Sequence, residues 1–272
     1  MKYAICNETF QDWPFDKAFA FAKQCGYCAI EFAPFTMGAD AYSISQDKRA
    51  EIRQQLADAQ LESIGLHWLL AKTEGYYLTS PDADVRKKTA DYLCELSRLC
   101  KDLCGDTMVL GSPQQRNLLP GVDHAHAMEY AADVIRAAEP TMKELGVTLA
   151  LEPLGPAEGD FLRTADSGIE LAKMIDSPNV RLHLDVKAMS TESKPIPDII
   201  RDSKDYIQHF HANDPNLLGP GMGDVDFTPI FAALKEIDYD GYVSVEVFNY
   251  EPGVEKIATE SIEYMKRVVS SL

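Results

Sequence analysis

Short apolar segments alternate with longer amphipathic segments along the whole chain. The apolar segments are four to six residues long, and many are rich in Val, Ile and Leu, which is typical of strands buried on both faces. The expected strands are Tyr3–Cys6, Ala29–Phe32, Ser63–His67, Thr107–Leu110, Thr148–Leu151, Arg181–Asp185, Ile207–His211 and Tyr242–Val247. The expected helices are Phe15–Gln24, Gln46–Ala59, Ala83–Leu103, Asp123–Leu145, Thr164–Ile175, Ile196–Ser203, Phe227–Glu236 and Val254–Val269.

Eight strand–helix units in 272 residues predict a single (β/α)8 TIM barrel that occupies residues 1–272 as one domain. Helix boundary signals agree, with Asp123 as an N-cap and Gly26 and Gly146 as C-caps. An open doubly wound sheet would need a glycine-rich turn after its first strand, and the segment from Cys6 to Thr9 has none.

Composition and charge narrow the choice of partners. Apolar residues make up 46% of the chain, which is enough for a large core, and the formal net charge is -17. A surface this acidic repels phosphate backbones and anionic lipids, so we expect no nucleic-acid partner and no membrane partner. No signal peptide or membrane-spanning segment is recognisable, which predicts a cytoplasmic protein.

The six cysteines are expected to be reduced thiols in such a chain. Cys25 and Cys28 have the spacing of a redox or zinc pair. The simpler interpretation is that Cys25 ends a helix capped by Gly26 and that Cys28 enters a strand. No second pair exists to complete a four-cysteine zinc site, so we assign no functional role to any cysteine.

The last four expected strands share an unusual feature at their C-terminal ends. Each places a carboxylate or an imidazole there after an apolar stretch: Glu152, Asp185, His211 and Glu246. Active sites of these barrels lie at this face, and three carboxylates buried together there require a compensating cation. Taken singly, each residue would more simply be a salt-bridged residue at a strand end. Together they predict one divalent metal ion, with Mn²⁺ expected and Mg²⁺, Co²⁺ or Zn²⁺ as alternatives.

The same residues resemble a known family. The sequence around Glu152-Pro-Leu, Leu184-Asp185, His209-Phe-His211 and Val245-Glu246, with Gly223–Phe227 leading to Gly241-Tyr242, is similar to the xylose isomerase-like TIM barrels. This family includes sugar phosphate isomerases/epimerases, sugar epimerases of the D-tagatose/D-psicose 3-epimerase type, hydroxypyruvate isomerases and inosose dehydratases. The resemblance covers nearly the whole chain and is more specific for the fold and the metal site than for the substrate.

The resemblance implies a metal-dependent sugar isomerase/epimerase that abstracts a proton next to the carbonyl of a keto-sugar, through a metal-stabilised enolate. Glu152 and Glu246 would bind the metal and also act as the catalytic acid and base. Asp185 and His211 would mainly set the metal geometry. The substrate would be a small sugar or a polyol-derived compound. Dimers and tetramers are common among the relatives, so a homo-oligomer is an alternative to a monomer.

The sugar-binding positions depart from the epimerase pattern. A histidine is expected three residues after Asp185 and a basic residue a few positions after His211, but this chain has Ala188 and Leu217 there. Glu158 does match a glutamate that contacts substrate in the relatives. The further substrate-binding candidates are Lys187, His67, Trp68 and Asn213. The alternative interpretation of Lys187 is a solvated lysine in a loop, and that of Trp68 is an ordinary aromatic residue at the rim of the barrel. His183 is either a partner of the metal ligands or, slightly preferred, a satisfied core histidine.

Three rival functions stay open at this point. An inosose dehydratase or keto-glycoside lyase would use the same metal and glutamate base but expel a β-substituent. A DNA-repair endonuclease would need a zinc cluster and many more than the six histidines present. A non-catalytic sugar-binding barrel would not need a second basic carboxylate.

The segment 219–223 resembles a phosphate cradle, but without an accompanying Lys or Arg it is interpreted as a turn-rich loop.

Overall fold

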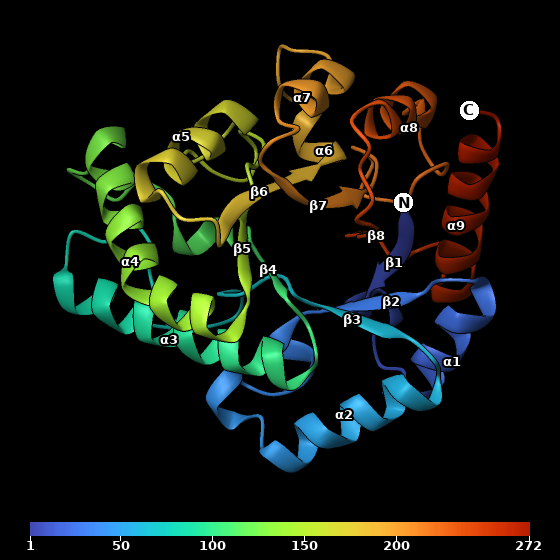
Figure 1. The fold of residues 1–272 in the computed structure, drawn as a ribbon, viewed down its shortest axis with the longest axis horizontal. Helices are drawn as coiled ribbons and strands as arrows, with labels where there is room; N and C mark the ends of the chain where they lie inside the picture. Colours follow the sequence, from blue (N-terminus) through green and yellow to red (C-terminus); the bar gives the residue numbers. More distant parts are fainter.

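Eight parallel strands close into a barrel in the computed structural model, which describes residues 1–272. Each strand pairs with the next along the chain, and β8 returns to pair with β1 (Figure 1). The predicted barrel is therefore confirmed. The strands are β1 (Lys2–Cys6), β2 (Ala29–Phe32), β3 (Glu62–Leu66), β4 (Thr107–Leu110), β5 (Thr148–Leu151), β6 (Val180–Asp185), β7 (Ile207–Ala212) and β8 (Tyr242–Val245).

The helices form a ring around the strands and cover their outer faces (Figure 1). They are α1 (Phe15–Cys25), α2 (Gln46–Asp58), α3 (Ala83–Asp102), α4 (His124–Leu145), α5 (Ala165–Ile175), α6 (Val186–Met189), α7 (Ile196–Asp202), α8 (Phe227–Glu236) and α9 (Val254–Ser270). Four short 3₁₀ turns lie in the loops: η1 (Asn7–Phe10), η2 (Pro34–Thr36), η3 (Ala41–Ser43) and η4 (Pro113–Gln115). Apolar faces of the long helices pack with the strands into one cluster of 66 buried residues.

Most predicted boundaries are correct to within one or two residues. The differences matter at two strand ends, because β3 stops at Leu66 and β8 at Val245, so His67 and Glu246 are the first residues of loops. The short helix α6 was not predicted, since four residues show no helical periodicity. It forms because the Asp185 carboxylate accepts a hydrogen bond from the backbone N–H of Ala188 at 2.7 Å and so caps it.

The capping prediction at Cys25 and Cys28 is also confirmed. Gly26 follows α1 in the left-handed region with φ of 98°, a conformation that costs glycine little. All six cysteines are free thiols. Only the side chain of Cys6 contributes to the barrel interior near the predicted metal ligands, where it lies 3.6 Å from the ring of His67.

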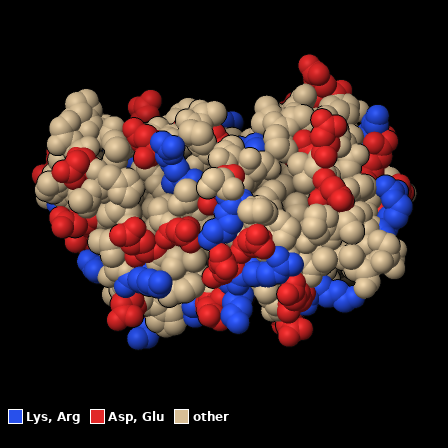
Figure 2. All heavy atoms as spheres, turned by 90° about the horizontal axis from the view of Figure 1, so that it is seen from above, with Lys and Arg blue, Asp and Glu red and all other residues tan.

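Acidic and basic side chains are interspersed over the face shown in Figure 2, so that no continuous basic band crosses this side of the molecule. None of the helices combines the length and the apolar character needed to span a bilayer.

Gly65 in β3 provides a test of how tightly the barrel is closed. It has φ of 142°, and a Cβ atom there would lie 1.9 Å from the carbonyl oxygen of Thr107 on β4. We expect Gly65→Ala to lower the free energy of unfolding by at least about 3 kcal/mol, because backbone must move apart. Gly121 is the control: it also has positive φ, but open space around it, so Gly121→Ala should cost only about 1 kcal/mol. Equal losses in urea denaturation would contradict this account.

Candidate metal and active site

The four predicted metal ligands converge at the C-terminal face of the barrel. Asp185 ends β6 and His211 lies on β7, while Glu152 and Glu246 directly follow β5 and β8. All four are buried. Ligand atoms of Glu152, Asp185 and His211 lie within 4.8 Å of one another, in a group that also includes His183. Glu246 joins them through its Oε2 atom, which is 3.1 Å from Nδ1 of His211.

The electrostatics of this group call for a cation. Burial, and then repulsion from Glu246 and Asp185, raises the pKa of Glu152 to about 8. Burial and the charge of Glu246 raise the pKa of Asp185 to about 6. A divalent ion would remove this repulsion and favour both ionised forms. Three carboxylates and one imidazole are a donor set suited to Mn²⁺ or Mg²⁺.

His183 does not behave as a satisfied core histidine. Its side chain is fully buried, neither ring nitrogen has a hydrogen-bond partner, and Nε2 lies 3.8 Å from Oε1 of Glu152. The slightly preferred expectation for this residue was therefore wrong. An unpartnered imidazole beside a crowded carboxylate is a second observation, independent of the charges, that the residues present fit a metal ion.

Glu31 on β2 lies beneath the predicted ligands and holds two imidazoles at once. Its Oε2 atom is 2.9 Å from Nε2 of His209 and 3.0 Å from Nε2 of His211. Burial alone would raise the pKa of Glu31, but these two histidines outweigh it and keep that pKa well below its usual range. An ionised carboxylate only accepts, so His211 presents an Nε2–H donor to Glu31 and turns Nδ1 toward the candidate metal site.

Glu246 is held by two further groups from the loop after β3. The indole N–H of Trp68 donates to its Oε1 atom at 2.8 Å, and Nδ1 of His67 lies 3.4 Å from the same oxygen. His67 in turn contacts Glu8 through Nε2 at 2.9 Å. Burial would raise the pKa of Glu246, but His211 and His67 outweigh it and hold this pKa well below its usual range.

The remaining predicted substrate-binding residues form a second small group. Lys187 forms an ion pair of 2.5 Å with Glu158, and its ammonium lies 4.6 Å from the ring centroid of Phe248. Lys187 is thus not the solvated loop residue of the alternative interpretation. Asn213 is fully buried; it donates to Asp185 and accepts from the backbone N–H of Lys187 at 2.8 Å. It therefore orients the carboxylate of Asp185.

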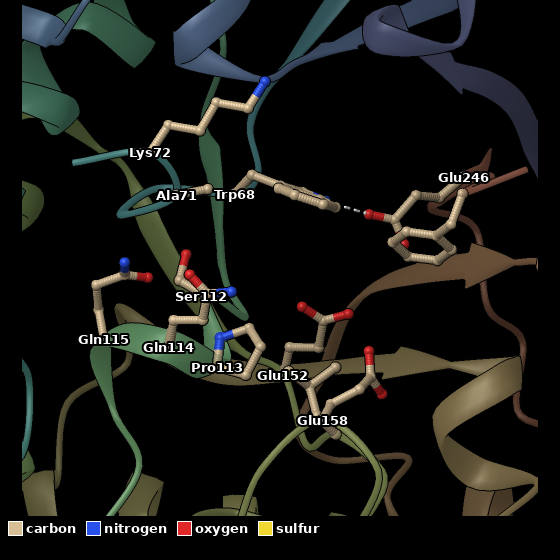
Figure 3. Close-up of a pocket in the computed structure, with 12 residues that line it drawn as sticks. Trp68, Ala71, Lys72, Ser112, Pro113, Gln114, Gln115, Glu152, Glu158 and Glu246 are labelled. Carbon is tan, nitrogen blue, oxygen red and sulfur yellow. Dashed lines mark hydrogen bonds between the residues drawn. The ribbon is translucent and has the colours of Figure 1, made fainter.

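A cavity of about 350 Å³ opens above these groups. Glu152 and Glu246 both line it, and Trp68 points across it toward Glu246 (Figure 3). Loops after β3 and β4 supply much of its wall, including Lys72, Gln114 and Gln115, and Glu158 and Phe248 line it from the loops after β5 and β8. The cavity thus brings two carboxylates, one aromatic face and several polar donors together.

Sequence reasoning missed two charged residues of this region. Glu31 carried a usable signal, because a charged residue stands between Ile30 and Phe32 in an otherwise apolar strand. Arg116 carried none, since it follows a loop of ordinary composition. Its guanidinium is buried, donates to the carbonyl of Leu110 at 3.1 Å and leaves Nη2 without a partner. The same carbonyl accepts from the backbone N–H of Glu152 at 3.2 Å, so a buried cation lies near this carboxylate.

Comparison with known proteins agrees with the barrel fold. The family model described as xylose isomerase-like TIM barrel matches residues 19–268. The chain belongs to this family. Within the xylose isomerase-like barrels, it is 30% identical over 175 residues to a D-psicose 3-epimerase of Ruminiclostridium cellulolyticum, which covers 63% of this chain and 59% of that relative. The match therefore spans less than two thirds of the relative's length.

Other members match over longer stretches. An L-ribulose 3-epimerase of Methylomonas sp. is 28% identical over 86% of this chain and 79% of its own. Among solved structures, D-psicose 3-epimerase with D-tagatose from Clostridium cellulolyticum H10 superposes with a TM-score of 0.88 at 20% identity, over 99% of both chains. This last likeness supports the fold.

The buried ionisable groups predict how stability depends on pH without metal. Glu152 has its pKa raised from 4.5 to about 8, and the pKa values of His67 and His211 lie well above 6.5 because neighbouring acidic groups outweigh burial. All three bind more protons in the folded than in the unfolded state above pH 6.5, so stability falls as pH rises toward 8. Calorimetry in chelator should show Tm decreasing over this window. A Tm that is constant or rises would contradict the burial of these charges.

Glu31 should control metal affinity without contacting the metal. Glu31→Gln keeps the size of the side chain but loses the charge that holds His211, and we expect Mn²⁺ binding to weaken about 10–100-fold in titration calorimetry. Glu170→Gln is the control, because Glu170 is an exposed residue of α5, and it should leave the affinity for Mn²⁺ unchanged. Wild-type affinity in Glu31→Gln would show that Glu31 only fills the barrel.

Proposed function

We propose that this protein is a metal-dependent epimerase that acts on a keto-sugar by moving a proton next to the carbonyl group. The observation that carries the proposal is that Glu152 and Glu246, from two separate strands, line the same cavity. Membership of the xylose isomerase-like family and the 3-epimerase names of the similar proteins support it. Reduced cysteines fit the cytoplasmic location expected from the sequence.

Glu152, Asp185, His211 and Glu246 would hold the metal, and Mn²⁺ is the ion we expect. When bound, such an ion supplies Lewis acidity to the carbonyl oxygen and so lowers the barrier to loss of the neighbouring proton. Glu31 and Asn213 would act on this set from outside, because they hold His211 and Asp185 by hydrogen bonds.

The two glutamates would then move the proton. One carboxylate takes the proton from carbon, and the electron pair of that C–H bond moves into the adjacent bond as the enolate forms. The other glutamate takes up a proton from water and delivers it to the same carbon on the opposite face, while the first glutamate releases its proton to water, so the reaction is balanced. A tightly lined cavity keeps the two groups within reach of one carbon.

The polar and aromatic groups around the cavity would hold the sugar. Glu158 and Lys187 offer an acceptor and a donor beside each other, in place of the missing histidine at Ala188. Trp68 offers an indole face in the cavity. His67 is buried and bonded to Glu8, so its contribution is to hold Glu246.

Replacing either glutamate should stop proton transfer. In D₂O with Mn²⁺ and a panel of keto-sugars, the wild-type protein should introduce deuterium next to the carbonyl and form an epimer, followed by NMR. Glu152→Gln and Glu246→Gln should each lower the exchange rate at least about 10³-fold. Glu144→Gln on exposed α4 is the matched control and should exchange at the wild-type rate.

The products of the same reaction separate the proposal from its rivals. A conjugated enone absorbing in the ultraviolet would indicate the dehydratase or lyase reaction instead of epimerisation. Absence of exchange with every keto-sugar, in protein that still binds Mn²⁺ and sugar, would indicate a sugar-binding barrel and overturn the proposal.

A further inference from the structure

We infer that the substrate is a keto-sugar carrying a second, neutral sugar ring, and that this ring binds in a second cavity beside the one that holds the two glutamates. The inference rests on the proposed function for the reacting ring. It assigns a new binding site to residues of the loops after β1, β2, β3 and β8, none of which was expected from the sequence to contact substrate except Trp68.

The second cavity is the larger of the two, with a volume of about 690 Å³. Four aromatic side chains line it in addition to Trp68: Trp13, Phe15, Phe35 and Tyr250. It shares the side chains of Trp68 and Lys72 with the first cavity. The two cavities are therefore adjacent, with Trp68 and Lys72 between them.

The backbone at the shared wall is strained in a way that places both side chains there. Trp68 and Lys72 have φ values of 53° and 59°, in the left-handed region that bulky residues rarely adopt. The indole of Trp68 is held by Glu246 and by the ring of Phe35, whose centroid lies 5.7 Å away. The ammonium of Lys72 lies 3.9 Å from the centroid of the same phenylalanine.

The polar groups of the second cavity select a neutral ligand rich in hydroxyl groups. Glu8 and Asp12 line it with one basic residue, Lys72, and this excess of carboxylates would repel a phosphate or carboxylate. Glu8 is buried, with 8% of its surface exposed, and its Oε1 atom has no hydrogen-bond partner. The exposed carboxylate of Asp12 is an acceptor for a hydroxyl donor, and the aromatic faces suit the C–H faces of a sugar ring.

The first cavity also lacks two side-chain hydrogen-bond donors that a free ketose would need. Ala188 and Leu217 offer no side-chain donor at the two positions where the ketose 3-epimerase pattern has basic residues. Binding energy from a second ring, remote from the reacting carbon, would compensate for the lost contacts and hold the reacting ring in place. A phosphate group could not do so from the acidic second cavity.

Four ketose probes test the assignment with the Mn²⁺-loaded protein in D₂O: fructose, fructose 6-phosphate, lactulose and isomaltulose. The last two are fructose with a second ring on oxygen 4 or oxygen 6, so carbon 3 is free to react. We expect kcat/KM for exchange to be at least about tenfold higher for one of these disaccharides than for fructose. Equal or faster exchange with fructose or its phosphate would overturn the inference.

Variants then locate the second ring. Phe35→Ala and, as a second variant on an exposed residue, Asp12→Ala should each reduce the preference for the disaccharide over fructose about threefold or more, mainly through KM. Tyr42→Ala is the control, because Tyr42 is an exposed aromatic residue outside both cavities. A preference that survives both cavity variants, or falls equally in Tyr42→Ala, would overturn the placement.

Titration calorimetry with the same disaccharides separates this inference from the proposed function. If no probe exchanges deuterium but a disaccharide binds more tightly than fructose and Phe35→Ala weakens it, the epimerase proposal fails and the second site stands. If exchange proceeds but neither disaccharide binds better than fructose, the second site is wrong and the epimerase proposal stands.

Discussion

The structure depends on a concentration of ionisable groups that have almost no access to water. Glu31, Glu152, Asp185 and Glu246 share the C-terminal end of the barrel with His67, His183, His209 and His211, and each of the eight is at most 7% exposed. Such an arrangement is tolerable only where each charge meets an opposite charge or a cation. The lower part of the cluster meets this condition with imidazoles, whereas the cations near Glu152 and Asp185 leave the pKa of each carboxylate raised.

This division explains which parts of the site are rigid. Glu31 is hydrogen-bonded to both His209 and His211, and all three residues lie on strands, so their positions follow from the barrel itself. Glu246 is held by Trp68 and His67 from the loop after β3 and by His211 from β7. The reacting groups are therefore positioned by residues of the barrel strands. The cavity wall around them is formed by loops, whose conformation the barrel does not determine.

The sequence allowed the residues at the strand ends to be predicted, but not the loops around them. Strand periodicity and the rule that functional residues follow barrel strands were enough to bring Glu152, Asp185, His211 and Glu246 together. The charge of Glu31 in an apolar strand was a signal, but strand periodicity did not place it beside the histidines, because the direction of a side chain in a tilted barrel strand depends on closure of the whole sheet. The left-handed conformation of Trp68 and the buried guanidinium of Arg116 depend on contacts between loops far apart in the chain. His183 was misjudged because pattern alone cannot tell whether a buried imidazole finds a partner.

The placement of the cavity walls on loops has a consequence for how this scaffold diversifies. Insertions and substitutions in the segment that carries Trp68 and Lys72, or in the one that carries Gln114 and Gln115, alter the shape offered to a ligand but leave every strand pairing intact. Selection can therefore change which sugar the cavity binds with little effect on folding. Within such a lineage, we expect the reaction to be preserved while the substrate specificity diverges. The strand-end residues would then change far more slowly than the residues that surround the ligand.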